Sequence, residues 1–209
     1  MGCPAHAEVA LSVARELGCS LEGTDLALAE LAASLAPGDA YSELQAVGVL
    51  CETFGHGPAL LLPDVLRARA GDSAGVALAV AAAAQRAGLS VDLVAPQNPG
   101  SVPSTMRFRS EQGFSYEHEV EGTDPLYLAH PDAPLVVEAS GRLLDGRTLG
   151  VDLEWQCAHE TTATILDRIA ERAERTGDLA LAIAARALTL PLEGDYRERE
   201  HARLLARLN

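Results

Sequence analysis

Positive charge is scarce in this chain. Of its 209 residues, 16 are basic and 30 are acidic, which gives a net charge of −14 and a pI near 4.7. All 16 basic residues are arginine, and lysine is absent. A protein whose main partner is nucleic acid or an anionic membrane needs clustered basic residues to offset the phosphate charge. The composition therefore argues against both classes of partner.

Long apolar runs are also missing. No stretch reaches the roughly 20 apolar residues that a membrane-spanning helix needs, and the N-terminus lacks the basic region and apolar core of a signal peptide. We therefore expect a cytoplasmic protein. With 48% hydrophobic residues, the chain can bury a core as one domain of moderate size, or as one domain with a helical appendage.

Patterns that bind metals or cofactors are absent as well. The four cysteines, Cys3, Cys19, Cys51 and Cys157, form no CxxC pair and no His-x-x-Cys spacing. They therefore suggest neither a zinc site nor a disulfide framework. The sequence has no phosphate-cradling glycine loop with a lysine and no dinucleotide fingerprint. We expect no metal and no cofactor, and we expect Cys51, in an apolar helical run, to serve packing.

The chain is organised around the stretch from Leu60 to Val94, which predicts a helix, a capped turn, a buried helix and a strand. Asp72 or Ser73 can cap the second helix, because a short side-chain oxygen satisfies the free N–H groups of its first turn. Gly88 suits the left-handed residue that ends a helix. The residues between are mostly alanine and valine on every side, so this helix is expected to be packed on several faces.

Three helices are predicted before this stretch, over Ala5 to Leu17, Thr24 to Leu35, and about Tyr41 to Phe54. Each has apolar residues at three- and four-residue spacing and ends at glycine or proline. Thr24 or Asp25 is the expected N-cap of the second helix. The first 90 residues therefore predict a helical block.

Short strands follow. Alternating residues predict a hairpin from Thr105–Arg109 and Phe114–Val120, and a second hairpin from Leu126–Ala129 and Leu135–Glu138. Four charged residues of the first hairpin, Arg107, Arg109, Glu117 and Glu119, are candidates for cross-strand pairs. His130 is expected on the surface of the turn in the second hairpin. The pattern predicts an α+β fold with an antiparallel sheet on the central helix.

The C-terminal part returns to helix, over Glu160–Arg175, Asp178–Leu190 and Tyr196–Leu208. The Gly-Asp break between the first two, with alanines on one side of the second, is typical of a tetratricopeptide helix pair. An independent solenoid needs at least three repeats, so this tail must pack against the rest of the fold.

Five ordered pieces of sequence carry a family resemblance: Leu61-Leu62-Pro63-Asp64-Val65-Leu66; Arg69 and Gly71; Arg86-Ala87-Gly88-Leu89; Leu135-Val136-Val137-Glu138 with Gly141-Arg142-Leu143-Leu144; and Arg175-Thr176-Gly177-Asp178. In this order the chain resembles the bacterial transglutaminase-like proteins of the SirB regulator type. The resemblance implies a helical block over 1–58, a transglutaminase-like core over 59–150 and a tetratricopeptide-like tail over 151–209. Within the core, about 97–123 reads as an inserted hairpin.

The resemblance also implies positions for a Cys-His-Asp triad at the N-terminus of the central helix and on adjacent strands. Ser73 stands at the nucleophile position, and Glu138 stands at the acid position. The family histidine would fall near Asp124 or Pro125, where no histidine stands. His118 in the inserted hairpin is a candidate replacement, which gives Ser73, His118 and Glu138 as a rearranged triad. Asp72 and Asp124 are candidate binding residues beside these positions.

Each candidate also has an ordinary structural explanation. Ser73 can be a helix cap, and His118, between two glutamates on an alternating strand, can be a solvated ion-pairing residue. Glu138 ends an apolar strand, where a buried carboxylate needs a partner. It either pairs, for instance with Arg142, or belongs to a polar pocket.

Two functions follow as alternatives. In the first, the chain is a pseudoenzyme that uses the cleft to bind a small molecule or a protein partner, since loss of both thiolate and imidazole removes nucleophile and base together. In the second, it is an enzyme of a specialised small-molecule biosynthetic pathway that uses the changed groups for acyl transfer, cyclisation or hydrolysis. A homodimer is compatible with both. We expect the cleft between the N-terminus of the 74–87 helix and the strand that ends at Glu138.

Overall fold

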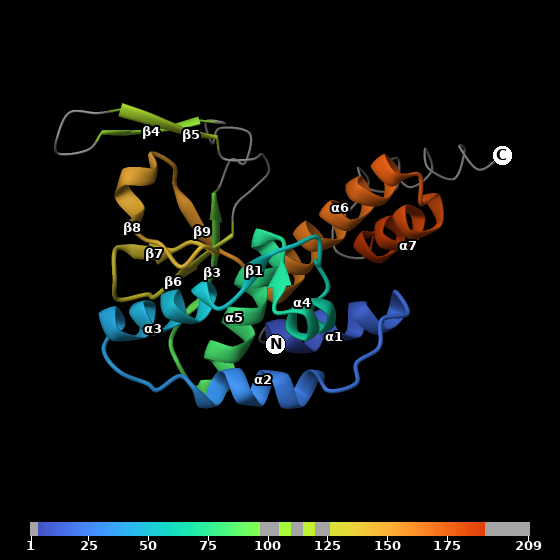
Figure 1. Ribbon diagram of the computed structural model, residues 1–209, viewed down its shortest axis with the longest axis horizontal. Coiled ribbons are helices and arrows are strands. Elements are labelled where there is room, and N and C mark those ends of the chain that lie inside the picture. Colours follow the sequence, from blue (N-terminus) through green and yellow to red (C-terminus); the bar gives the residue numbers. More distant parts are fainter. Residues whose placement is uncertain (1–3, 97–104, 110–114, 120–125, 191–209) are drawn as a thin grey trace.

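The computed structural model describes residues 4–96, 105–109, 115–119 and 126–190, and shows an α+β fold (Figure 1). Its helices are α1 His6–Glu16, α2 Thr24–Ala33, α3 Ala40–Glu52, α4 Leu62–Ala68, α5 Ser73–Ala87, the 3-10 helix η2 Gly146–Leu149, α6 Ala158–Thr176 and α7 Leu179–Thr189. Its strands are β1 Gly55–His56, β2 Ala70–Gly71, β3 Asp92–Pro96, β4 Thr105–Arg109, β5 Ser115–Glu119, β6 Tyr127–Ala129, β7 Leu135–Val137, β8 Leu143–Asp145 and β9 Leu153–Trp155.

Helix α5 is the buried centre of the fold, as predicted (Figure 1). The Asp72 side chain caps it by accepting from the Ala74 N–H at 3.1 Å. Gly88, with φ +80°, ends it in the left-handed conformation. Every residue from Ala74 to Ala84 is buried. Because most of these side chains are methyl groups, helices α1 to α4 and α6 and strands β3 and β6 all contact it closely.

The predicted strand after α5 begins later than expected. The Leu89 N–H bonds to the Ala84 carbonyl at 3.0 Å, and the Gly88 N–H bonds to Gln85. These bonds close the end of the helix. Leu89 is therefore part of the helix terminus, and β3 starts at Asp92.

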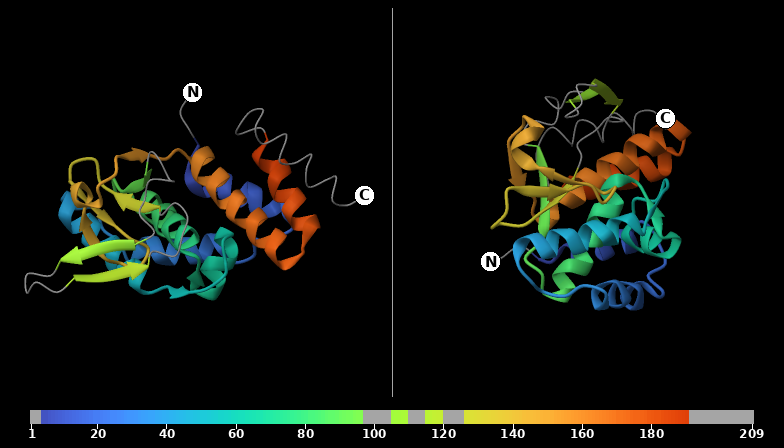
Figure 2. Two further views of the ribbon diagram at one scale, coloured as in Figure 1. Left: turned by 90° about the horizontal axis from the view of Figure 1, so that it is seen from above. Right: turned by 60° about the vertical axis from the view of Figure 1, so that its left-hand side comes forward.

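The main sheet has the strand order β8-β7-β6-β3-β9, and every neighbouring pair is antiparallel. Leu93, Leu128 and Val137 belong to the core that includes α5. Their sequence neighbours Val94, Tyr127 and Val136 form a second cluster with Leu149 of η2. The alternation of a pleated sheet thus gives it two packed faces, and Figure 2 shows helices α1 to α5 gathered on one side of it.

The predicted first hairpin is present as β4 and β5, which form a sheet of their own rather than strands of the main one. Its register places Arg107 opposite Glu117, as predicted. Arg109 lies opposite Ser115 and Glu119 opposite Thr105, so these two candidates have no charged residue directly across the hairpin.

The C-terminal hairpin consists of α6 and α7, which pack against each other. Gly177, with φ +81°, ends α6, and the Asp178 side chain accepts from the Leu181 N–H to cap α7. Helix α6 also contacts α1 and α5, so the hairpin packs on the core, as its short length requires. The predicted helix over 196–208 lies outside the described residues.

Two of the smaller sequence predictions are wrong. Gly23, not Thr24 or Asp25, precedes α2 as its N-cap residue. His130 is only 6% exposed, because its turn packs against α3. Its Nδ1 accepts from the Asp132 N–H, and its Nε2 lies 3.7 Å from the buried carboxylate of Glu43.

Candidate functional site

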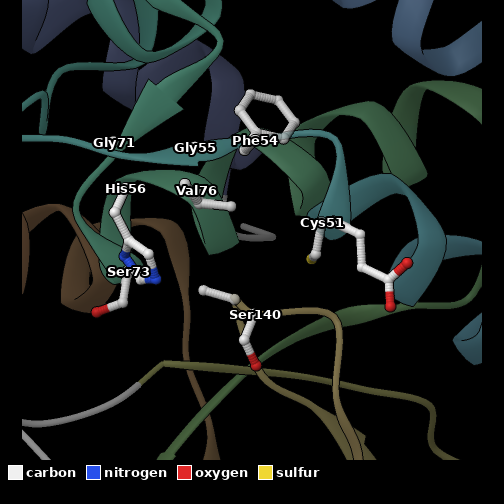
Figure 3. A pocket seen from close by; sticks show the side chains of 10 residues that line it. Cys51, Phe54, Gly55, His56, Gly71, Ser73, Val76 and Ser140 are labelled. Atoms are coloured by element: carbon white, nitrogen blue, oxygen red, sulfur yellow. The ribbon is translucent and has the colours of Figure 1, made fainter.

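A cavity of about 200 Å³ opens at the N-terminal end of α5 (Figure 3). It is lined by Cys51, Glu52, Phe54, Gly55, His56, Gly71, Ser73, Val76, Ala139 and Ser140. These residues come from the end of α3, from β1 and β2, from the first turn of α5, and from the turn after β7. The cavity therefore lies where the sequence predicts the cleft.

Strands β1 and β2 bring His56 to the start of α5. They pair in parallel with His56 opposite Gly71, and the Gly57 N–H donates to the Gly71 carbonyl at 3.0 Å. The Asp72 N–H then donates to Ala59 at 2.8 Å. This short ladder fixes the segment before α5 and leaves His56, which is exposed, in the wall of the cavity beside Ser73.

Ser73 is the first residue of α5 and lines the cavity. Of the two N-cap candidates, the structure uses Asp72, so the Ser73 hydroxyl is not the cap. The Ser73 Oγ lies 3.5 Å from the Arg168 guanidinium on α6. A guanidinium is a donor without any acceptor capacity, so it cannot take a proton from the hydroxyl.

Asp72 is engaged by the C-terminal hairpin. Arg168 Nη1 lies 2.5 Å from its Oδ1, and Arg172 Nη2 lies 3.5 Å from its Oδ2. Arg172 also bonds to the Pro58 carbonyl. The carboxylate that caps α5 therefore also forms ion pairs that connect α6 to the core. Asp72 is not among the residues that line the cavity.

Glu138 pairs with Arg142, one of the two alternatives left open by the sequence. Arg142 Nε and Nη2 donate to the two carboxylate oxygens at 2.9 Å each, and the Ser140 hydroxyl donates at 3.0 Å. Burial, with a smaller contribution from the Glu138 charge, raises the pKa of Tyr127 to about 12. The described residues that line the cavity include Ala139 and Ser140 but not Glu138.

The structure does not describe the side chains of the remaining predicted residues. His118 belongs to β5, where its backbone is opposite Met106. Its side chain and the whole of Asp124 lie outside the described residues. The grouping of His118 with Ser73 stays a prediction.

Cys51 forms an inner wall of the cavity and is fully buried. Burial, with a smaller contribution from the Glu52 charge, raises the pKa of its thiol to about 12. The thiol is therefore protonated near neutral pH, and a protonated thiol is a poor nucleophile. The prediction that Cys51 serves packing is confirmed.

Two lining residues, Glu52 and His56, were not singled out by the sequence. The available signal was the run Gly55-His56-Gly57 together with Gly71, since glycines permit two backbones to approach closely. A Cβ at Gly57 would lie 3.3 Å from the Cβ of Ala70. The sequence alone indicated only that a helix ends at these glycines.

Within the described part of the chain, no three His, Cys, Asp or Glu side chains are grouped so that they could hold a metal ion. None of the described helices combines the length and hydropathy needed to cross a bilayer. The chain matches no family model, no curated protein and no solved structure. The resemblance to transglutaminase-like proteins accordingly stays a prediction from the ordered sequence pieces.

Proposed function

We propose that this chain is a transglutaminase-like binding or regulatory module whose cavity at the start of α5 holds a ligand without acyl-transfer chemistry. One observation carries the proposal: the Ser73 hydroxyl contacts a guanidinium, at 3.5 Å from Arg168 Nη1. A serine is a nucleophile near neutral pH only when a base can remove its proton, and an arginine cannot do so.

Glu138, which stands at the acid position of the triad, supports the same function. In a working triad the carboxylate orients an imidazole. Here both oxygens of Glu138 accept from Arg142, and one also accepts from Ser140. This carboxylate stabilises the β7–β8 turn, and that turn supplies Ala139 and Ser140 to the cavity wall.

In this proposal the chain is divided as a helical block over 1–58, a core over 59–150 and a helical tail over 151–209. The tail holds the start of α5 through the two arginines on Asp72, which favours a regulatory use of the α6–α7 hairpin. We also propose a cytoplasmic location, supported by the three described cysteines, which are all free thiols.

An acyl-transfer assay tests the proposal. The purified chain is incubated with activated esters and glutamine-containing peptides, with and without added amines, beside the variant Ser73→Ala and the exposed control Ser90→Ala. We expect no turnover above the buffer rate for any of the three. Turnover by the native chain and Ser90→Ala that Ser73→Ala abolishes would contradict the proposal.

A second candidate function is an enzyme that has repurposed the cavity, and one observation favours it. His56 lines the same cavity as Ser73 (Figure 3), so a rotated Ser73 side chain would have an imidazole available as general base. In that case ester hydrolysis requires both side chains. Equal and complete loss of turnover in Ser73→Ala and His56→Gln would establish this candidate in place of the first.

A further inference from the structure

The charge of the cavity comes from one residue. Among the described residues that line it, Glu52 is the only carboxylate, and none of them is an arginine. Two carboxylates that adjoin lining residues in the sequence are in ion pairs, Asp72 with Arg168 and Arg172, and Glu138 with Arg142. Glu52 forms no ion pair with any residue that the structure describes. The described lining of the cavity therefore carries one carboxylate that no described ion pair neutralises.

The backbone around Glu52 holds this carboxylate against the β7–β8 turn. Gly141 has φ +88°, and a Cβ there would lie 2.4 Å from the Glu52 Cγ and 2.7 Å from the Gly48 carbonyl. Only glycine allows the turn to approach α3 so closely. The Glu52 charge contributes to the raised pKa of Cys51, so it acts on the inner wall of the cavity even though its side chain is exposed.

The other walls suit a cation that carries hydrogen-bond donors. Phe54 contributes an apolar ring to the wall, and the Arg69 guanidinium already occupies a cation–π position on it, 5.8 Å from the ring's centroid. Ser73 and Ser140 contribute hydroxyl oxygens that can accept. At about 200 Å³ the cavity is smaller than the roughly 300–1,000 Å³ of sites for drug-sized ligands, so its occupant is small.

From these contacts we propose that the cavity binds a small organic ammonium ion, with Glu52 as the residue that selects for positive charge. This inference rests on the proposed binding function and adds the chemical class of the ligand. The ammonium group lies against the Glu52 carboxylate, and its carbon chain lies along Phe54 and Val76. The net charge of −14 raises the local concentration of such cations around the chain.

Three probes of equal chain length test the inference: n-butylammonium chloride, n-butanol and sodium butyrate. Binding of each to the full chain is measured from amide chemical shifts of the ¹⁵N-labelled protein at constant ionic strength. We expect n-butylammonium to shift the amides of Gly55, Gly71, Ser73 and Ser140 and to bind at least about tenfold more tightly than n-butanol, with no binding of butyrate.

The matched variants are Glu52→Gln and Glu30→Gln, which remove one negative charge from the cavity and from an exposed position on α2, respectively. Glu52→Gln should remove the preference for the ammonium probe, whereas Glu30→Gln should keep it. In the unaltered chain, the affinity for n-butylammonium should also fall as salt is raised, which tests the charge without any substitution.

The inference is overturned if n-butanol or butyrate binds at the same amides as tightly as n-butylammonium, or if Glu52→Gln keeps the preference. It is also overturned if n-butylammonium shifts no amide of the cavity wall. A neutral or anionic occupant would leave the proposed binding function standing, and the acyl-transfer assay with Ser73→Ala decides that function separately.

Discussion

The body of α5 and its N-terminal end differ in almost every physical respect. From Ala74 to Ala84 the helix is buried on all sides and contacts its neighbours through methyl groups. At the start, Asp72 and Ser73 meet two arginines of α6 and a cavity wall. The difference teaches that one helix can serve both stability and binding, because its interior hydrogen bonds are complete while its first N–H groups still need partners.

The body of α5 should tolerate larger side chains less than any other part of the helix. Ala81 is fully buried, so Ala81→Leu adds three carbons where there is no space, and overpacking of this kind costs about 1–3 kcal/mol. The same change at Ala33, at the exposed end of α2, should cost far less. Urea unfolding of both variants measures the difference. Similar losses at the two positions would show that the body is not closely packed.

The N-terminal end should be the next most sensitive. Asp72→Ala removes both the helix cap and the contacts with Arg168 and Arg172, which together stabilise the fold by about 1–3 kcal/mol. Limited proteolysis should also release α6 and α7 earlier in this variant than in the native chain, because the hairpin loses its fastening. An unchanged unfolding free energy and unchanged cleavage would contradict the role assigned to Asp72.

The C-terminal end of α5 has its own buried polar contact, and it should respond to pH. His6 Nε2 lies 3.2 Å from the Thr161 hydroxyl, and its Nδ1 lies 3.1 Å from Gln85 and 3.4 Å from Asp92. Burial lowers the pKa of His6 below its usual 6.5, although Asp92 opposes the shift. The unfolded chain therefore binds the proton first, and His6 contributes stability above pH 6.5 that is lost as pH falls below it.

Unfolding free energies measured across this range should show the loss in the native chain and a smaller loss in His6→Gln, whose side chain does not titrate. Equal pH dependence in the two proteins would mean that His6 does not titrate as its burial requires.

The smallest effect is expected at the exposed pair of Asp25 and Arg86, whose guanidinium lies 2.5 Å from the carboxylate. Asp25 is largely solvent-exposed, and exposed ion pairs are weak and screened by salt. Asp25→Asn should therefore leave the unfolding midpoint close to that of the native chain. A loss of unfolding free energy as large as that of Asp72→Ala would contradict the expected difference between the Asp72 contacts and this exposed pair.

The helices, including the buried central helix α5, could be predicted from the sequence because their signals are local. Asp72, the alanine run and Gly88 each determine the conformation of their own neighbours. The α5 face of the cavity could be predicted for the same reason. The pairing of Gly55–His56 with Ala70–Gly71 could not be predicted from the sequence. Two-residue strands have no sequence pattern of their own and depend on how α3 and α4 pack.

His130 and Glu138 show, for single residues, what can and cannot be predicted from the local sequence. The turn that contains His130 reads as polar surface, yet it is buried against Glu43, which no local pattern indicates. Glu138 lies two residues after Val136, which packs on the face of the sheet away from α5. The period of two in a strand was therefore the signal that this carboxylate turns away from the cavity.

Labelling of Ser73 tests most directly whether the start of α5 is a binding surface or a catalytic centre. The native chain is treated with a fluorophosphonate that reacts with activated serines, and the peptides are analysed by mass spectrometry. Because the Ser73 hydroxyl contacts Arg168 rather than a base, we predict no adduct on Ser73 beyond that of the urea-unfolded chain. A stoichiometric adduct on Ser73 in the folded protein, abolished in His56→Gln, would contradict this account.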